Sequence, residues 1–386
     1  MINIHISERE LQLPDAVIGK LLGIATTRKD IISISAGEPD FKTPKPILDY
    51  GKKVISSSTH YSHPKGVPEL REALIKKLKA YNKIKTSPEN IIVTTGSQEA
   101  IITSLLCALD PGEQVVIPNP GYLAYIPAVE LVSAQPVYVK LLEEENFELN
   151  PDRIKEAIDR KKTKAIIINT PSNPTGTVLS KKILEEIADI AVQYDLYVFS
   201  DEAYEKLIYE DKKHISIGSL NGIQDHVASF YSFSKTYAMC GFRVGYCVGP
   251  RELIDAMEKT HHYITLTAPH ISQLMAIKSL SISNSYIEKM KNEYNRRRKM
   301  IVKRLNDLNL VTKTPYGAFY TFSNIQNYSK NSFKFASDLL KKAKVAVVPG
   351  TEFGKYGEGY IRCSYATDYH LIEKAMDRIE TYLKKL

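Results

Sequence analysis

Short apolar runs rich in isoleucine and valine alternate with longer amphipathic stretches from about residue 90 onward. Such runs predict buried strands, and apolar positions spaced three and four residues apart predict helices. Regular alternation of the two is typical of a mainly parallel sheet covered by helices. The predicted strands are residues 91–94, 114–118, 136–139, 165–169, 196–200, 226–232 and 244–249, and helices over 97–108, 181–194 and 252–261 follow or separate them. We therefore expect one large α/β domain with a mostly parallel seven-stranded sheet.

The pattern changes at residue 284. A long basic amphipathic helix is predicted to begin there, and strand signals follow at residues 318–322, 345–348 and 360–364. These elements predict a smaller α+β domain. The first 40 or so residues end in a loop-like Gly37-Glu38-Pro39-Asp40, and we expect them to pack beside that domain. The predicted division is residues 45–283 for the large domain, and 1–44 together with 284–386 for the small one.

The composition indicates a globular protein but does not indicate a function. A chain of 386 residues with 43% hydrophobic content can bury a sizeable core, and 25% charged residues are usual for globular proteins. No apolar run approaches the roughly 20 residues that cross a bilayer, so no membrane partner is expected. The net charge of +8 discriminates little between partners, and the basic clusters lie in helical patterns, where a solvated helix face explains them. We expect no nucleic-acid partner.

The N-terminus and the cysteines both indicate a cytoplasmic protein. The first 15 residues lack a basic stretch followed by an apolar stretch, which a secretory signal would need. The four cysteines are widely spread with no C-x-x-C pair, which favours buried, reduced, structural thiols over disulfides or zinc ligands. They are Cys107, Cys240, Cys247 and Cys363.

Polar residues follow four of the predicted strands, where ligands bind in open α/β sheets. Residues 91–94 lead into Thr95-Gly96-Ser97-Gln98 and an apolar helix, which offers free backbone N–H groups to an anion, although a plain helix cap explains it as well. Residues 165–169 lead into a rigid turn around Asn173. The other two strands end in chemically active groups: Asp201 with Tyr204 after one, and Ser232-Phe233-Ser234-Lys235 with Arg243 after the other.

The order and spacing of these groups resemble the class I aminotransferases of pyridoxal-phosphate fold type I. Three motifs carry the resemblance: Asn173-Pro174-Thr175-Gly176, Asp201-x-x-Tyr204, and Ser232-x-Ser234-Lys235 followed by Gly241-x-Arg243-x-Gly245. It extends from Gly37-Glu38-Pro39-Asp40 to Arg362-x-Ser364-Tyr365-Ala366, nearly the whole chain. Two further segments are most similar to the archaeal and bacterial branch of aspartate and aromatic aminotransferases, namely Gly317-Ala318-Phe319-Tyr320 and Val347-Val348-Pro349-Gly350.

The resemblance implies pyridoxal 5′-phosphate as cofactor and assigns catalytic roles to Lys235, Asp201 and Tyr204. Lys235 would hold the cofactor aldehyde as a Schiff base and then carry a proton between substrate and cofactor. Asp201 would keep the ring nitrogen protonated, so that the ring can accept electrons. Tyr204 and Asn173 would contact the 3-oxygen of the ring, and Tyr122 would stack on it.

The remaining implied residues bind the cofactor phosphate and the substrate. The phosphate would be held by Gly96, Ser97, Gln98, Ser232, Ser234 and Arg243, together with Tyr61 from a partner subunit. The resemblance therefore implies a homodimer with shared active sites. Substrate would be bound by Gly37, Asn173 and Arg362, of which the Arg362 guanidinium suits the α-carboxylate.

The implied activity is ping-pong transfer of an amino group from an L-amino acid to 2-oxoglutarate. A neutral or aromatic donor is favoured over aspartate, because neither Gln98 nor residues 260–265 supply the extra cation that aspartate-specific relatives use. A β-lyase or decarboxylase of the same fold shares every cofactor contact and stays open. Two other classes are disfavoured: a non-catalytic regulatory module, since no DNA-binding extension is visible, and a serine acyl-enzyme built on Ser232-x-x-Lys235, since its companion motifs are missing.

His261 and His262 beside Tyr263 form the one histidine pair that suggests metal binding. No suitably spaced histidine or carboxylate accompanies the pair, so we expect a structural role and no metal.

Overall fold

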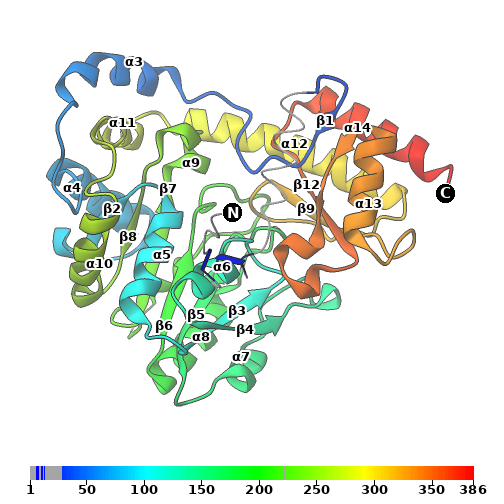
Figure 1. Cartoon of the computed structure of the whole chain (residues 1–386). Helices are drawn as coiled ribbons and strands as arrows, with labels where there is room; N and C mark the ends of the chain where they lie inside the picture. Colours follow the sequence, from blue (N-terminus) through cyan, green and yellow to red (C-terminus); the bar gives the residue numbers. More distant parts are fainter. Residues whose placement is uncertain (1–5, 8–9, 12, 14–27, 221) are drawn as a thin grey trace, which may run out of the picture.

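The computed structural model describes residues 6–7, 10–11, 13, 28–220 and 222–386. Figure 1 shows a large sheet with helices around it and a second group of strands and helices built from the C-terminal part of the chain. None of the helices in the described part of the chain has both the length and the apolarity needed to cross a membrane.

Seven strands form the large sheet in the order β2-β8-β7-β6-β5-β3-β4. β8 runs antiparallel to both of its neighbours, and the other neighbouring strands pair in parallel. The mostly parallel α/β sheet is thus confirmed, and its strands lie within two residues of the predicted bounds. They are β2 (Ile91–Thr94), β3 (Gln114–Asn119), β4 (Gln135–Lys140), β5 (Thr163–Asn169), β6 (Tyr197–Asp201), β7 (Val227–Ser232) and β8 (Gly245–Val248).

Helices cover both faces of this sheet because its strands are apolar on both sides. In β5, Ile166 and Ile168 pack with α7 (Pro151–Ala157) and α8 (Lys181–Tyr194), whereas Ala165 and Ile167 face the opposite way. That opposite face is covered by α5 (Ser97–Ala108), α6 (Tyr125–Leu131) and α10 (Arg251–Ile264). A third apolar cluster joins the β2 end of the sheet to α3 (Lys45–Val54), α4 (Pro68–Lys77) and α11 (His270–Leu280).

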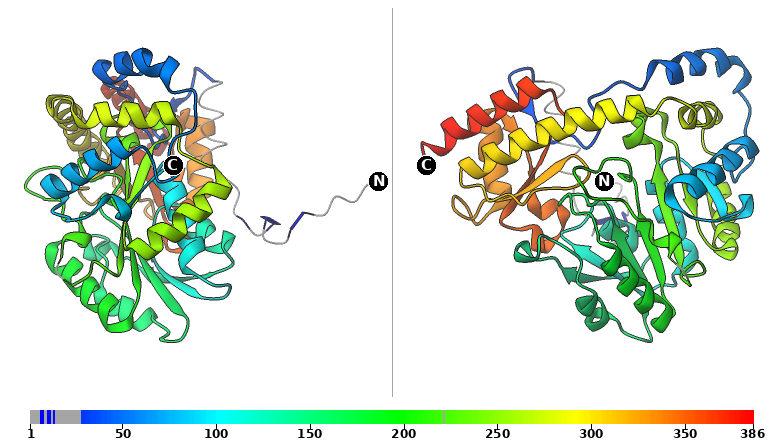
Figure 2. Two further views of the ribbon diagram at one scale, coloured as in Figure 1. Left: turned by 90° about the vertical axis from the view of Figure 1, so that its left-hand side faces the viewer. Right: turned by 180° about the vertical axis from the view of Figure 1, so that it is seen from behind.

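The C-terminal unit begins with the predicted long helix, α12 (Ser285–Asp307). This helix runs from the neighbourhood of α11 toward α14 (Tyr369–Leu383), as Figure 1 and the right-hand view of Figure 2 show. Three antiparallel strands form its sheet in the order β11-β12-β9. They are β9 (Tyr320–Asn324), β11 (Val348–Pro349) and β12 (Tyr360–Ser364), with α13 (Ser332–Asp338) between β9 and β11.

One strand prediction in this unit was wrong, and another was confirmed with its bounds shifted by two residues. The single strand expected at residues 345–348 is two short strands, because the chain changes partner at the buried Val347: β10 (Val345–Ala346) pairs with β1 (Ile32–Ser33), and β11 pairs with β12. The strand expected at residues 318–322 begins later, since Ala318 adopts a φ of 58° that breaks the extended backbone.

The pairing of β1 with β10 brings residues 32–33 beside the C-terminal unit. Most of residues 1–27, which we assigned to the small domain, lie outside the described residues. The division at residues 44 and 284 therefore stays a prediction.

Candidate active site

A cavity of 440 Å³ lies at the carboxyl ends of β5, β6 and β7, where they meet the C-terminal unit. All of the predicted site residues except Tyr61 line it: Gly37, Gly96, Ser97, Gln98, Tyr122, Asn173, Asp201, Tyr204, Ser232, Ser234, Lys235, Arg243 and Arg362. Cys240 also lines it, so this thiol is not simply part of the core as expected; Cys247 and Cys363 are buried, and all four thiols are free.

Lys235 presents its amine to this cavity from a very short helix, α9 (Phe233–Thr236), that follows β7 directly. Ser232 caps the helix, with its Oγ accepting a hydrogen bond from the Ser234 N–H at 3.2 Å. The Lys235 Nζ donates to the Gly37 carbonyl at 2.6 Å and lies 6.0 Å from the centre of the Tyr204 ring. The cap thus orients the lysine toward the cavity.

Asp201 is the last residue of β6 and is buried. Its Oδ2 accepts a hydrogen bond from the Tyr125 hydroxyl at 2.8 Å, and its Oδ1 accepts one from the Ala203 N–H at 3.1 Å. Burial raises the pKa of Asp201 above its ordinary value, while these hydrogen bonds and the charge of Lys235 oppose the rise. A cation placed against this carboxylate would be bound strongly, since little water competes for it.

Phenols line the cavity next to Asp201. The Tyr204 and Tyr320 hydroxyls are 2.9 Å apart, and burial raises the pKa of Tyr204 well above its ordinary value of 10. Burial also raises the pKa of Tyr122 to about 12. The Tyr204 and Tyr122 hydroxyls are therefore neutral at physiological pH and can donate hydrogen bonds.

Arg362, on β12, is 1% exposed and faces the cavity from the C-terminal unit. Its Nη1 donates to Asn173 Oδ1 at 3.1 Å and its Nη2 to the Ser35 carbonyl at 2.7 Å, while its Cζ lies 4.3 Å from the centre of the Tyr320 ring. Its buried Nε has no hydrogen-bond partner within the described part of the chain. A buried unpaired guanidinium nitrogen is rare, and it indicates a place for an acceptor on a ligand.

The opposite end of the cavity is suited to an anion. Gly96 caps α5 with a φ of 91°, and a Cβ there would lie 2.8 Å from Arg243 Nη2. A Cβ on Gly245 would lie 2.6 Å from the Ser97 nitrogen, so both positions need glycine. The first N–H groups of α5, the Arg243 guanidinium and the Ser232 and Ser234 hydroxyls converge here. Such groups at a helix N-terminus bind phosphate or carboxylate.

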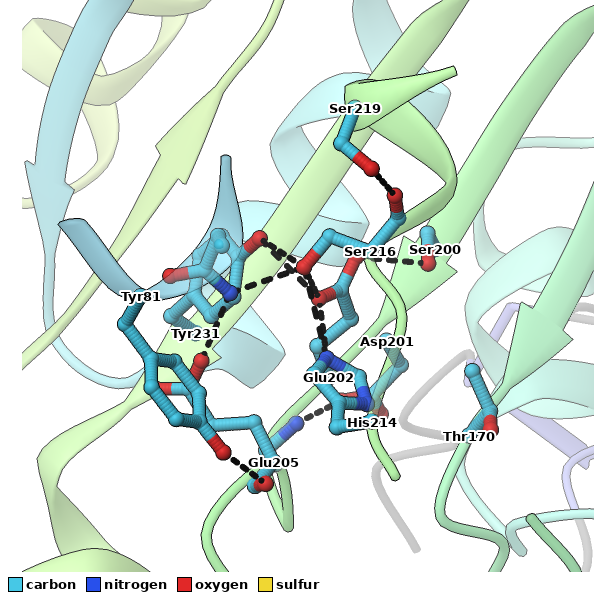
Figure 3. A network of polar contacts seen from close by, with 12 residues as sticks. Tyr81, Thr170, Ser200, Asp201, Glu202, Glu205, His214, Ser216, Ser219 and Tyr231 are labelled. Carbon is cyan, nitrogen blue, oxygen red and sulfur yellow. Dashed lines mark hydrogen bonds and ion pairs between the residues drawn. The ribbon is translucent and has the colours of Figure 1, made fainter. Parts of the chain in front are cut away.

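A buried polar network lies behind Asp201, as Figure 3 shows. The Glu202 carboxylate contacts His214 Nε2 at 2.6 Å, Ser216 Oγ at 2.5 Å and the Tyr231 hydroxyl at 3.0 Å. Burial alone would raise the pKa of Glu202, but His214 and the two hydroxyls outweigh it and lower that pKa. The network stabilises a charged residue directly next to Asp201 in the chain.

Glu202, Glu205 and His214 are close enough together to bind a metal ion. The Lys77 ammonium, however, lies 2.5 Å from Glu205 Oε1 and donates to the Tyr246 hydroxyl at 3.0 Å. Lys77 therefore supplies positive charge at this cluster.

Comparison with known proteins identifies the family. Residues 29–379 match the sequence profile of aminotransferase class I and II. The chain belongs to this aminotransferase family. It is 47% identical to an aspartate aminotransferase of Pyrococcus abyssi, with 95% of each chain covered, and 42% identical to aromatic-amino-acid aminotransferase 2 of Thermococcus litoralis, with 98% of each covered.

A solved structure agrees with this identification. The crystal structure of an aromatic aminotransferase from Pyrococcus horikoshii superposes with a TM-score of 0.90 at 45% identity and covers 95% of this chain and 99% of that one. The resemblance deduced from the motifs is thereby confirmed, and the chain is an aminotransferase of the pyridoxal-phosphate-dependent type.

The residues of this aminotransferase fit the cofactor that the family implies. Pyridoxal phosphate presents an aldehyde, a ring nitrogen that can carry a proton, and a phosphate. The cavity offers a free amine, a buried carboxylate and an anion cradle that two glycines keep open. The unpaired Arg362 Nε is a further hydrogen-bond donor at the cavity wall.

Two features of the site were not predicted by sequence reasoning, and one predicted residue lies elsewhere. Tyr320 contacts Tyr204 and Tyr125 contacts Asp201, yet neither tyrosine was assigned a role in the site from the sequence. Only the aromatic ending of Gly317-Ala318-Phe319-Tyr320 could have indicated one of them. Tyr61 is 80% exposed and lies outside this cavity, beside a second depression lined by His60, Thr265 and His270. Its assignment to a partner subunit's site stays a prediction.

Proposed function

We propose that this aminotransferase binds pyridoxal phosphate covalently at Lys235 and transfers the amino group of a neutral or aromatic L-amino acid to 2-oxoglutarate. One observation carries the proposal: the Lys235 amine, the Asp201 carboxylate and the Arg362 guanidinium line the same cavity. These three groups supply what such a reaction needs at the cofactor aldehyde, the cofactor ring and the substrate carboxylate.

When bound, pyridoxal phosphate supplies a conjugated ring that takes up the electron pair left by the departing substrate α-proton. Lys235 holds the cofactor until a substrate amine replaces it, and its freed amine then moves the proton. Asp201 keeps the ring nitrogen protonated. Tyr125 and the Ala203 N–H hold the Asp201 carboxylate in a fixed orientation for that task. Tyr204 and Asn173 hydrogen-bond the ring oxygen, and Tyr122 covers the ring.

The anion end of the cavity suits the cofactor phosphate. Gly96, Ser97 and Gln98 provide N–H groups at the start of α5, and Arg243 provides the charge. Ser232 and Ser234 complete this half. These groups would hold the phosphate in the same cavity that Lys235 lines.

The charges around the cavity favour a donor without a second carboxylate. Among the described lining residues the only guanidiniums are Arg243 and Arg362, which the phosphate and the α-carboxylate would use. Glu38 also lines the cavity and would repel an acidic side chain, whereas Ile101, Leu123 and Tyr320 offer apolar contact. Gly37 and Asn173 lie where they can position the substrate.

We further propose a cytoplasmic homodimer in which Tyr61 of each subunit completes the phosphate site of the other. The exposed Tyr61 supports the homodimer. The free thiols support the cytoplasmic location.

A panel of amino donors assayed against 2-oxoglutarate tests the function. Phenylalanine and tyrosine should give a kcat/KM at least about tenfold above that of aspartate, and Lys235→Ala should be inactive with every donor. A preference for aspartate would contradict the donor class. Transamination by Lys235→Ala at the rate of the unmodified protein would contradict the site.

A further inference from the structure

The loop between β2 and α5 forms hydrogen bonds with the carboxylate of Glu99, which does not line the cavity. We propose that Glu99, supported by His261 and Thr265, is a positioning residue that keeps this loop in the shape needed to bind the cofactor phosphate. The proposal rests on the proposed function, in which Gly96, Ser97 and Gln98 contact that phosphate.

Glu99 lies in the first turn of α5 and accepts four hydrogen bonds. Its Oε2 accepts from the Thr95 N–H at 2.6 Å and from the Thr95 hydroxyl at 2.5 Å. Its Oε1 accepts from His261 Nδ1 at 2.6 Å and from the Thr265 hydroxyl at 2.9 Å. One carboxylate thus joins the loop before α5 to the end of α10.

His261 makes the far side of this connection rigid. Its side chain is completely buried, and its Nδ1 must carry the hydrogen because it donates to Glu99. Burial alone would raise the pKa of Glu99, but the hydrogen bonds from His261 and Thr95 outweigh it and lower that pKa to about 2. Glu99 is therefore ionised at neutral pH and accepts strong, charge-assisted hydrogen bonds. This pairing also accounts for the histidine that the sequence singled out.

The held segment adjoins the phosphate-binding groups directly. While the N–H and hydroxyl of Thr95 bond to Glu99, its carbonyl accepts a hydrogen bond from Arg243 Nη2 at 3.3 Å. The next residue, Gly96, has a φ of 91° and no side chain to restrain it. If Thr95 were released, the backbone around Gly96 could rotate and turn the N–H groups of Ser97 and Gln98 away from an anion.

Two roles for Glu99 predict opposite results. As a bare negative charge near the N-terminus of α5, it would weaken phosphate binding, and its removal would tighten that binding. As a positioning residue, it strengthens phosphate binding, and its removal would weaken it. The sign of the change distinguishes the two.

The test compares the affinity of the cofactor-free chain for pyridoxal phosphate and for pyridoxal, which has the same ring and aldehyde but no phosphate. Glu99→Ala should weaken binding of pyridoxal phosphate about tenfold or more, as expected for lost hydrogen bonds to a charged group, and change binding of pyridoxal less than about twofold. Glu99→Gln, which keeps part of the hydrogen bonding, and Thr95→Val, which removes one bond, should give smaller losses in the same direction. If Glu99→Ala does not fold, Thr95→Val still tests whether losing a hydrogen bond to Glu99 weakens the binding of pyridoxal phosphate.

Glu202→Gln is the matched control, since it alters the other buried glutamate–histidine pair, which does not contact this loop. Because pyridoxal and its phosphate share the ring next to Asp201, this control should leave the ratio of the two affinities unchanged. Two results would overturn this proposal but leave the proposed function intact. One is unchanged or tighter binding of pyridoxal phosphate by Glu99→Ala and Thr95→Val, and the other is an equal loss of affinity for both ligands. A wild-type chain that does not prefer pyridoxal phosphate to pyridoxal would overturn the proposed phosphate site, and this proposal with it.

Discussion

Charged side chains in the cavity differ in how many of their polar atoms form hydrogen bonds within the protein. Arg362 is the clearest case, because two of its nitrogens donate to protein oxygens while the buried Nε has no partner among the described residues. Asp201 accepts two hydrogen bonds yet lies against an open cavity. Neither group is paired with an opposite charge in these contacts, so a ligand could supply one. This arrangement is typical of a binding site rather than of a structural ion pair.

Replacing Arg362 with lysine should lower kcat/KM by a similar factor for every amino acid donor, because the α-carboxylate is common to all of them. Lysine keeps the charge but loses the forked geometry, and the loss should be on the order of 2 to 5 kcal/mol in transition-state stabilisation. A simple primary amine without a carboxylate should be nearly unaffected. If the penalty appeared only with dicarboxylic donors, Arg362 would be recognising the side chain instead.

Replacing Asp201 with asparagine should leave the fold intact and slow the half-reaction with an amino acid by more than about tenfold, because the ring nitrogen would lose the charge that keeps it protonated. Single-turnover kinetics with the cofactor-loaded protein measure this rate. Tyr125→Phe is the natural companion, since it removes only one hydrogen bond to the same carboxylate and should cost less. A smaller effect of Asp201→Asn than of Tyr125→Phe would contradict the assigned role.

The polar residues that follow strands could be predicted from the sequence, because the carboxyl ends of parallel strands meet at one edge of the sheet. Asn173, Asp201 and Lys235 are of this kind. Tyr320 and Glu38 reach the cavity from other parts of the chain; both lie in segments that carry the family resemblance, but neither was assigned a role in the site. Their positions depend on how the C-terminal unit packs on the sheet, which a single sequence does not reveal.

At the scale of elements, predictions succeeded where a segment is long and apolar. The helices at 97–108 and 181–194 lie where the pattern predicted them. The prediction of one strand failed for β10 and β11, which are short and pair with different strands on either side of one residue. In these segments the choice of partner strand outweighs local preference.

The connection between α5 and α10 through Glu99 should contribute to stability in a pH-dependent way. The folded-state pKa of Glu99 is about 2, below the ordinary value of 4.5, so its contribution is fully present above the ordinary pKa and is lost as pH falls toward 2. The difference in free energy of unfolding between the wild type and Glu99→Gln should therefore be larger at about pH 7 than at about pH 3.5.

Urea unfolding at the two pH values measures this difference. Glu144→Gln provides a control, since it changes the same residue type outside the Glu99 connection. A difference for Glu99→Gln that stayed constant, or grew, on acidification would contradict the low pKa of the folded state.

At the scale of the whole molecule, the exposed Tyr61 and its surroundings are the strongest indication of a second subunit. An exposure of 80% is unusual for a residue that the family resemblance assigns to the cofactor phosphate. The proposed site shared between two subunits would explain this exposure, because the same tyrosine would be buried once a partner is present.

Mixing two inactive variants tests this arrangement. Tyr61→Ala and Lys235→Ala chains, unfolded and refolded together, should form heterodimers with one intact site and recover part of the wild-type activity. Each variant refolded alone is the control. Absence of recovery in heterodimers demonstrated by tagged purification would contradict the shared site, as would full activity of a strict monomer.

In the proposed function, Lys235 is the amine that carries the cofactor. The most direct measurement is reduction of the protein with borohydride after incubation with pyridoxal phosphate, followed by peptide mapping. One modified peptide is expected, with the reduced cofactor on Lys235 and loss of visible absorbance. Reduced cofactor on a different lysine, or no modified peptide, would contradict it.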